Sequence, residues 1–296
     1  MTRLLARALD YARFGLDFFV LRNDKPHVLG LITNDTCNLH CRGCRVANVD
    51  KTSMTMNDIR TTLERYHQRG VRMAYVSGGE PYLWRDGRYR LPDIVELAHD
   101  IGYLRVHVYT NGTASLSAVP DFTWISIDGF GKTFEKLRGI PVDRVIRNAR
   151  SFTGRHAVVC TINTANLEEI PQTLEFLDKE LPGTGVMFFF HTPYYGIDDL
   201  YLSHEQRAQA VETVLDCKKT GFPVLNSRPA LEAYLSQSFG PPLCNSWIVD
   251  NSGEHLCCRV EGDPDICRDC GYLTGYEILL ARRWRPESIR VLLRTH

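Results

Sequence analysis

The stretch Thr36-Cys37-Asn38-Leu39-His40-Cys41-Arg42-Gly43-Cys44 places three cysteines within eight residues. It directly follows an apolar, β-rich run at 27–33, so the thiols come at the carboxyl end of a predicted strand. Thiols spaced this closely in a chain with no disulfide pattern indicate a metal site or a catalytic use.

Composition limits the classes of protein that the chain can belong to. With 296 residues and 44% hydrophobic composition, it can form one large α/β domain and a small appendage. The balance of 35 basic against 35 acidic residues argues against a nucleic-acid binder that works by bulk charge. Arg3, Arg7, Asp10 and Arg13 interrupt any amino-terminal apolar leader, and ten cysteines then point to a reducing, cytoplasmic location.

Short β-rich runs alternate with helical periodicity through most of the chain. Strands are expected at 27–33, 72–77, 104–110, 123–127, 157–162 and 185–190. Helices are expected at 57–69, 91–101, 142–152 and 167–180. This order predicts parallel strands joined by right-handed crossovers, in a partial (β/α)6 TIM-like barrel or, alternatively, a doubly wound sheet. In either architecture, chemistry is expected at the carboxyl ends of the strands.

The sequence also suggests three segments. We expect an amphipathic helix at 1–26, the partial barrel at 27–220, and a small Cys-rich module with a basic amphipathic tail at 221–296. Both terminal segments combine apolar residues at helical spacing with arginines. Such helices pack on their own domain or lie on an anionic membrane surface, so a peripheral membrane association stays open.

Three thiolates can ligate three irons of a cubane cluster and leave the fourth iron open, whereas the simplest alternative is a structural zinc knuckle. The CxxxCxxC spacing, with His40 before the second cysteine, resembles the radical S-adenosylmethionine (SAM) superfamily. The resemblance implies that Cys37, Cys41 and Cys44 hold a [4Fe–4S] cluster whose open iron binds SAM. It further implies that an electron from an external ferredoxin- or flavodoxin-type reductant cleaves SAM to a 5′-deoxyadenosyl radical.

Polar residues and glycines follow the next strands. Glycines allow close backbone approach, and exposed carbonyls or a carboxylate can accept a hydrogen bond from an ammonium group. The segment after the second strand resembles the GGEP motif, which implies binding of the SAM amino group by Ser77, Gly78, Gly79, Glu80 and Pro81. The resemblance also assigns SAM contacts to Asn111, Ser126 and Asp128, and more weakly to Asn163. The alternative for these positions is ordinary turn chemistry.

A second group of cysteines lies near the carboxyl end of the chain: Cys244, Cys257, Cys258, Cys267 and Cys270. The group resembles the twitch or SPASM auxiliary-cluster module, although the spacing from Cys244 to Gly253 is one residue short. The resemblance implies a second [4Fe–4S] cluster on Cys244, Cys258, Cys267 and Cys270. A zinc site is the main alternative, because CxxC with two further thiols also forms a tetrahedral site. A reactive thiol without metal is the third.

The sixth strand ends in aromatic residues, and His191, Tyr194 and Tyr195 follow as candidate catalytic residues. A core strand with a capping histidine is the alternative. The late motifs resemble the hopanoid adenosyltransferase (adenosylhopene synthase) subfamily: PYYGIDD at 193–199, LNSRPALEAYL at 225–235 and CRDC at 267–270. This resemblance implies an isoprenoid or lipid substrate at the membrane surface, with hydrogen abstraction or adenosyl addition. The alternatives are a peptide maturase, a dehydrogenase of a small polar substrate, and a non-enzymatic iron–sulfur regulator.

Overall fold

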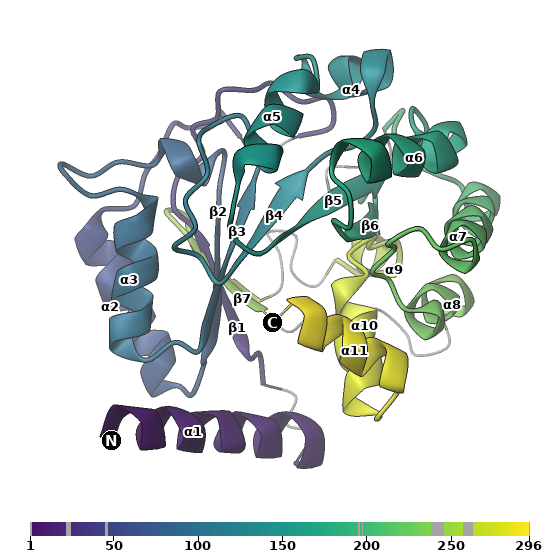
Figure 1. The fold of residues 1–296 in the computed structure, drawn as a ribbon. Helices are drawn as coiled ribbons and strands as arrows, with labels where there is room; N and C mark the ends of the chain where they lie inside the picture. The colour runs from purple at the N-terminus through teal and green to yellow at the C-terminus, as the bar shows by residue number, and fades with distance from the viewer. Residues whose placement is uncertain are drawn as a thin grey trace.

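A computed structural model describes residues 2–21, 25–44, 47–194, 196, 198–237, 246–256 and 263–295. Its centre is a curved sheet with helices on the convex side (Figure 1). Six parallel strands follow one another in chain order across the sheet. They are β1 (Val28–Ile32), β2 (Met73–Ser77), β3 (Arg105–Thr110), β4 (Phe122–Ser126), β5 (His156–Ile162) and β6 (Val186–Phe190). The predicted α/β partial barrel is confirmed.

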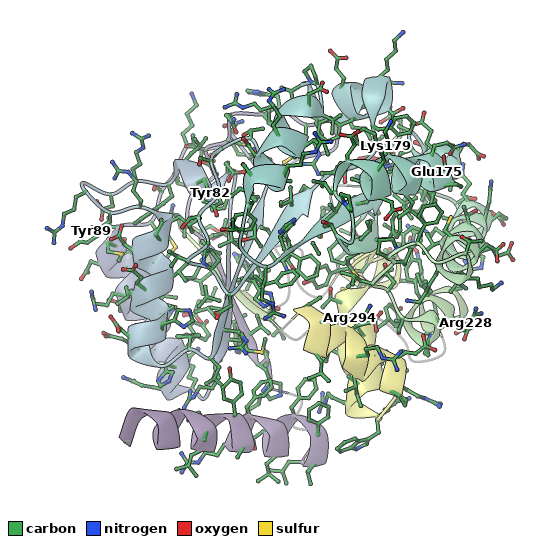
Figure 2. All side chains as sticks on the ribbon, viewed as in Figure 1. Tyr82, Tyr89, Glu175, Lys179, Arg228 and Arg294 are labelled. Atoms are coloured by element: carbon green, nitrogen blue, oxygen red, sulfur yellow. The ribbon has the colours of Figure 1, made fainter. Side chains whose placement is uncertain are left out.

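The crossover helices follow the strands closely. They are α2 (Met56–Gln68), α3 (Leu91–Ile101), α4 (Gly131–Arg138), α5 (Asp143–Ser151), α6 (Ile170–Glu180) and α7 (His204–Lys219). Glu175 and Lys179 extend from the outer face of α6, away from the sheet (Figure 2). The sequence analysis missed α4, because this helix is short and buries only Phe134 and Leu137.

Alternate residues of each strand point to opposite faces of the sheet, so one face packs on helices and the other lines the concave side. Leu29, Leu31 and Val76 are fully buried and face α2 and α3 in the outer core. Tyr75, Tyr109 and other residues of the opposite parity line the concave side. This separation leaves the concave side free to hold a cavity, while the outer face provides most of the hydrophobic core.

The carboxyl-terminal part adds helix α8 (Arg228–Ser236), strands β7 (Ser246–Asp250) and β8 (Gly253–Leu256), and helices α9 (Pro264–Arg268), α10 (Thr274–Arg282) and α11 (Pro286–Thr295). Strand β7 extends the main sheet by pairing in parallel with β1, and β8 pairs antiparallel with β7. The sequence analysis did not identify these strands in the Cys- and Gly-rich stretch. The expected boundary at residue 220, between the barrel and the Cys-rich module, is not tested by the structure and stays a prediction.

The amino-terminal helix α1 (Thr2–Gly15) continues into a π-helix, η1 (Leu16–Val20), below the amino-terminal end of the sheet (Figure 1). Phe14, Phe18 and Phe19 pack against a cluster that includes Ile278 and Ala281 of α10. Several neighbouring apolar side chains remain exposed: Leu9, Leu16, Val20, Leu21 and Trp284. Within the described ranges, no helix is both long and apolar enough to cross a membrane. Association with a membrane surface stays a prediction.

Candidate active site

The three cysteines of the first group line one cavity of about 390 Å³ at the carboxyl ends of the strands. Residues at the ends of β2, β3, β4 and β5 form its opposite wall. Cys37 and Cys41 are half-buried, and Cys44 is exposed. The loop after β1 therefore brings the predicted cluster ligands to the edge of the barrel where chemistry was expected.

Polar groups surround the two inner sulfurs. The Sγ of Cys37 accepts hydrogen bonds from the Leu39 amide at 3.4 Å and from Asn111 Nδ2 at 3.6 Å. The Sγ of Cys41 lies 3.9 Å from Nη1 of Arg138. Burial raises the pKa of both thiols, and the Arg138 charge opposes this shift at Cys41. Donors directed at a sulfur stabilise its thiolate form, which is the form that binds metal.

The donor set fits an iron–sulfur cubane better than a single ion. Among the described residues, no three His, Cys, Asp or Glu side chains converge closely enough to hold one metal ion. A cubane is wider than a zinc ion, whose thiolate ligands all lie at about 2.3 Å from one centre. Three thiols spread around one cavity, with N–H donors on two of them, match the needs of a three-ligand cluster.

The GGEP segment is joined to the cysteine loop by backbone hydrogen bonds. The amide of Gly79 donates to the Asn34 carbonyl at 2.7 Å, and the amide of Glu80 donates to the Thr36 carbonyl at 2.9 Å. The chains approach so closely that a Cβ on Gly79 would lie 2.3 Å from the Thr36 carbonyl oxygen. Glycine is required here for this close contact.

Glu80 is completely buried between the ends of β2 and β3. Its carboxylate accepts hydrogen bonds from Thr110 Oγ1 at 2.8 Å, the Asn111 amide at 2.8 Å and the Tyr82 amide at 3.1 Å. Burial raises the pKa of this carboxyl, and the three donors oppose the rise. These contacts make Glu80 a positioning residue that holds two strand ends together. Within the described residues no hydrogen bond engages the carbonyls of Gly78 and Gly79, whereas those of Ser77, Glu80 and Pro81 accept from the chain itself.

Asp128 forms an ion pair with Arg138, a residue that the sequence analysis missed. Nε of Arg138 donates to Oδ2 of Asp128 at 2.7 Å, and the Thr161 amide donates to Oδ1 at 2.8 Å. Burial alone would lower the pKa of Arg138, but Asp128 and Cys41 raise it above its usual range. The guanidinium therefore stays charged beside the cysteine loop. Helix α4, which carries Arg138, gave too weak a pattern to place this residue in advance.

The remaining predicted SAM contacts differ in how free their polar atoms are. The side chain of Asn163 closes its own turn with the Ala165 amide and the Thr161 carbonyl. Asn111 is held by Asn38 and Thr113. Ser77 and Ser126 line the cavity, and their hydroxyls have no hydrogen-bond partner within the part of the chain that the structure describes. These two hydroxyls are the ones free to bind a ligand.

Of the three candidate catalytic residues, the structure describes His191 and Tyr194, which line different cavities. His191 lines the cysteine-bearing cavity, where its Nε2 lies 2.9 Å from Oδ1 of Asp198. Tyr194 instead lines a second cavity on the concave side of the sheet. Tyr195 lies outside the described residues. Asp198, which orients His191, was not singled out from the sequence.

The second cavity has a volume of about 420 Å³ and occupies the interior of the half-barrel. Its wall is mainly aromatic and aliphatic and includes Tyr75, His107, Tyr109, Trp124, Val159, Met187, Phe189, Ile248 and Tyr272. Ser77, Tyr109 and Ser126 line both cavities, so the two adjoin at the carboxyl ends of β2, β3 and β4. A polar, cysteine-bearing chamber thus opens directly against an apolar one.

Residues 31–177 match the family model described as the radical SAM superfamily. The chain belongs to this superfamily. A pre-heme d1 synthase of Dinoroseobacter shibae is 29% identical to it over 196 residues, which cover 61% of this chain and 43% of the relative. A GTP 3′,8-cyclase of Tolumonas auensis is 31% identical over 107 residues, which cover 33% of this chain and 31% of the relative. The chain therefore spans less than half of either curated relative.

Solved structures share the fold of this radical SAM chain. The structure of anSMEcpe with bound AdoMet and a Kp18Cys peptide has a TM-score of 0.63 at 15% identity, and the match covers 91% of this chain and 83% of that one. Streptococcus suis SuiB bound to the precursor peptide SuiA has a TM-score of 0.62 at 14% identity, covering 86% of this chain and 65% of that one. At these identities the likeness concerns the fold.

In this radical SAM chain, the CxxC of the second cysteine group closes one side of the interior cavity. Cys267 and Cys270 both line it. The intervening Asp269 is anchored on two sides, because Tyr201 donates to its carboxylate at 2.8 Å and Arg207 donates to its carbonyl at 3.2 Å. The other predicted ligands of this group, Cys244 and Cys258, lie outside the described residues, as does Cys257. Whether this group binds a second [4Fe–4S] cluster, zinc or no metal stays a prediction.

We expect Gly79→Ala to displace the GGEP segment of the radical SAM domain from the cysteine loop. The added Cβ would collide with backbone oxygens rather than with flexible side chains, so the SAM dissociation constant should rise by about tenfold or more. Gly15→Ala is the matched control, because a Cβ at Gly15 meets nothing within 4 Å. Equilibrium dialysis with labelled SAM measures the effect. Equal SAM affinities for the two variants would contradict the assignment.

Proposed function

We propose that this protein is a radical SAM enzyme that acts on a substrate whose apolar part occupies the interior cavity. When bound, the cluster and SAM supply a one-electron cleavage that yields methionine and a 5′-deoxyadenosyl radical, which takes a hydrogen atom from a substrate carbon or adds to it. The electron comes from an external one-electron reductant. The observation that carries this proposal is the shared lining of the two cavities by Ser77, Tyr109 and Ser126.

The chain's own residues have separate tasks in this proposal. Cys37, Cys41 and Cys44 are the metal ligands. The backbone carbonyls of Gly78 and Gly79 accept hydrogen bonds from the SAM ammonium group, and the hydroxyls of Ser77 and Ser126 bind the rest of the ligand. Arg138 contributes a fixed positive charge beside Cys41 that favours thiolate and carboxylate groups. His191, oriented by Asp198, is available at the same wall to hold or accept a proton.

The CxxC supports a second metal centre near the substrate. Cys267 and Cys270 lie in the wall of the interior cavity, where a second [4Fe–4S] cluster completed by Cys244 and Cys258 would border the substrate. A zinc ion is the alternative metal for the same four cysteines. Iron and zinc counting separates the two: about eight irons per chain support two cubane clusters, whereas four irons with one zinc support the zinc site.

An apolar substrate part is supported by the nature of the interior wall. Aromatic and aliphatic side chains desolvate a hydrocarbon favourably but would leave the polar groups of a sugar or nucleotide without partners. This agrees with an isoprenoid or other lipid chain. The second candidate is a peptide, which is favoured by the similarity in fold to anSMEcpe and SuiB, both solved with peptides bound. An apolar peptide side chain would fit the same cavity.

Hydrogen transfer distinguishes these substrates. Cells that contain this protein are grown in deuterated water, and their organic-solvent extract and their peptide fraction are each incubated with reconstituted protein, unlabelled SAM and dithionite. We expect 5′-deoxyadenosine to form and to carry deuterium from the organic extract. Deuterium from the peptide fraction alone would select the peptide candidate. Absence of both 5′-deoxyadenosine and an adenosylated product in every incubation would refute the proposed activity.

A further inference from the structure

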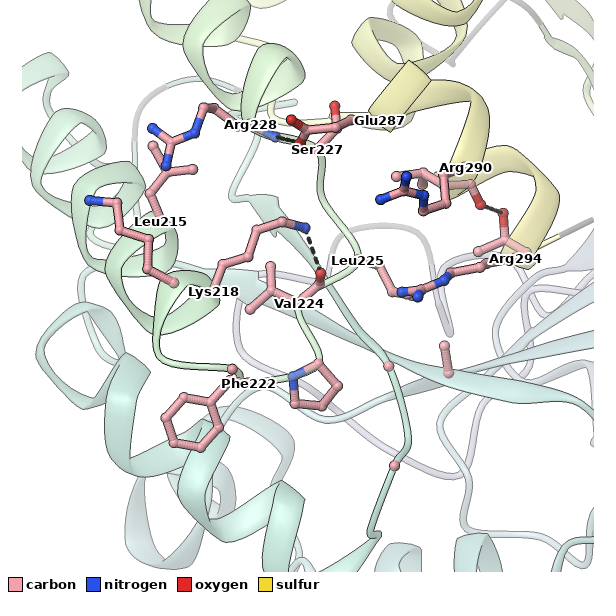
Figure 3. A pocket seen from close by; sticks show the side chains of 18 of the residues that line it. Leu215, Lys218, Phe222, Val224, Leu225, Ser227, Arg228, Glu287, Arg290 and Arg294 are labelled. Atoms are coloured by element: carbon pink, nitrogen blue, oxygen red, sulfur yellow. Dashed lines mark hydrogen bonds between the residues drawn. The ribbon is translucent and has the colours of Figure 1, made fainter. Parts of the chain in front are cut away.

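A third cavity, of about 850 Å³, lies near the amino-terminal ends of β4, β5 and β6, opposite the cysteine loop. It shares no lining residue with the cysteine-bearing cavity. Its walls come from the end of α7, the segment leading into α8, and α11 (Figure 3). The proposed SAM chemistry assigns no role to this cavity.

Cationic side chains from three separate segments converge on this cavity. Lys218 and Lys219 come from α7, Arg228 from α8, and Arg290 and Arg294 from α11. Glu287 is the one carboxylate among the lining residues. Because the whole chain has as many acidic as basic residues, this local excess of positive charge is not a consequence of a generally basic protein.

Some of these cations form ion pairs with carboxylates of the chain, and others do not. Lys219 pairs with Asp216, and Arg228 pairs with Glu232. Within the described ranges, no carboxylate lies at ion-pair distance from Lys218, Arg290 or Arg294. Figure 3 shows the Lys218 side chain between Arg228 on one side and Arg290 and Arg294 on the other. Three unpaired cations around one hollow favour an anion from outside the chain.

Lys218 is partly buried at the centre of this set. Its Nζ donates to the carbonyls of Val224 at 2.9 Å and Asn226 at 2.8 Å. Burial lowers the pKa of the ammonium group; the charges of Glu287 and Glu277 oppose this shift, and the smaller effects of Arg294 and Arg290 add to it. A bound anion would relieve the repulsion among the cations.

We propose that this cavity binds a small molecule that carries a diphosphate or triphosphate group. Guanidinium groups match phosphate oxygens in planar, bidentate geometry, and more than one phosphate is needed to reach the three cations that α7 and α11 contribute without an ion pair. The volume lies within the range of small-molecule sites, about 300–1,000 Å³. The Phe222 ring in the same wall provides an apolar surface for the rest of the ligand (Figure 3).

Binding here would also affect the interior cavity. Val291 and Thr295 of α11 are both buried and line both spaces. A ligand held by Arg290 and Arg294 fixes the helix that forms part of the substrate wall. The site does not depend on the proposed SAM cleavage, because none of its residues belongs to the cysteine-bearing cavity.

Calorimetric titration of the reconstituted full-length protein with pyrophosphate, and separately with ATP, tests the site. We expect saturable binding of one molecule per chain that weakens as salt is added. The double variant Arg290→Gln/Arg294→Gln should raise the dissociation constant by about tenfold or more, since it removes two charge-assisted contacts. Pyrophosphate should also raise the melting temperature of the wild type but not of the double variant.

Arg285→Gln is the matched control, because Arg285 is an exposed arginine just before α11 that does not line the cavity. It should bind both probes like the wild type. The proposal is overturned if neither probe binds saturably to the wild type, or if the double variant, with an unchanged melting temperature in the absence of ligand, binds as tightly as the control. Since binding is measured without SAM, a failure of the proposed enzymatic activity leaves this result interpretable.

Discussion

Cys41→Ala should eliminate 5′-deoxyadenosine formation from SAM and dithionite, reducing it to the level of a sample without protein. The sulfur of Cys41, one of the three predicted ligands, lies 3.9 Å from Arg138 Nη1. Its loss leaves two thiols for a cluster that needs three, and it removes the thiolate that this charge stabilises. Iron analysis should show a loss of about four irons per chain relative to the wild type.

The control for this variant is Cys217→Ala. Cys217 is buried in α7 and lines neither the cysteine-bearing nor the interior cavity. Its replacement should cost about 1 kcal/mol of stability while leaving iron content and SAM cleavage unchanged. If Cys41→Ala retained full iron and full 5′-deoxyadenosine formation, the cluster would have to be assigned to other thiols.

The second large effect is expected from Asp128→Asn. The amide that replaces the carboxylate would keep an oxygen to accept from the Thr161 amide but would leave the Arg138 charge without its partner, with only 15% of the Arg138 side chain exposed to water. Breaking a buried ion pair in this way costs roughly 3–5 kcal/mol, more than removing an ordinary hydrogen bond. Denaturant unfolding should therefore show a lowered midpoint with an unchanged slope, together with weakened SAM binding.

Asp216→Asn serves as the comparison, because it also removes a carboxylate from an ion pair. Both Asp216 and its partner Lys219 are largely exposed, at 70% and 59%. An exposed pair contributes about 0–1 kcal/mol, so this variant should unfold close to the wild type. Similar losses of stability in the two variants would argue that the Asp128 pair is as well hydrated as one on the surface.

Much of the fold could be predicted from local pattern. The six strands of the barrel and the helices between them lie within a few residues of their expected positions, because parallel strands buried on both faces give long apolar runs. Helix α4 and strands β7 and β8 were not predicted, because their sequence patterns are short and polar or rich in glycine. Phe189 packs against two hydrophobic clusters and also lines the interior cavity, since strand parity turns it away from the fully buried Phe188.

The features of the candidate site also divide into those predicted from the sequence and those seen only in the structure. The sequence by itself determined the cysteine triplet, the GGEP segment and the polar strand ends, because each is a contiguous motif whose chemistry can be inferred without knowing its neighbours. Only the tertiary structure decided how these groups are used. It placed Arg138 against Cys41, engaged Glu80 with Thr110 and Asn111, and left the hydroxyls of Ser77 and Ser126 free.

The same distinction holds for the CxxC and for the cationic cavity. Cys267 and Cys270 were identified from spacing, but their position beside the apolar interior depends on packing between segments far apart in the chain. In the sequence, Arg290 and Arg294 belong to a basic amphipathic tail and Arg228 to the LNSRPALEAYL stretch, and nothing there connects them with Lys218. The interaction between charges depends on the distance between them, which only the fold sets. The fold brings these four side chains to one cavity.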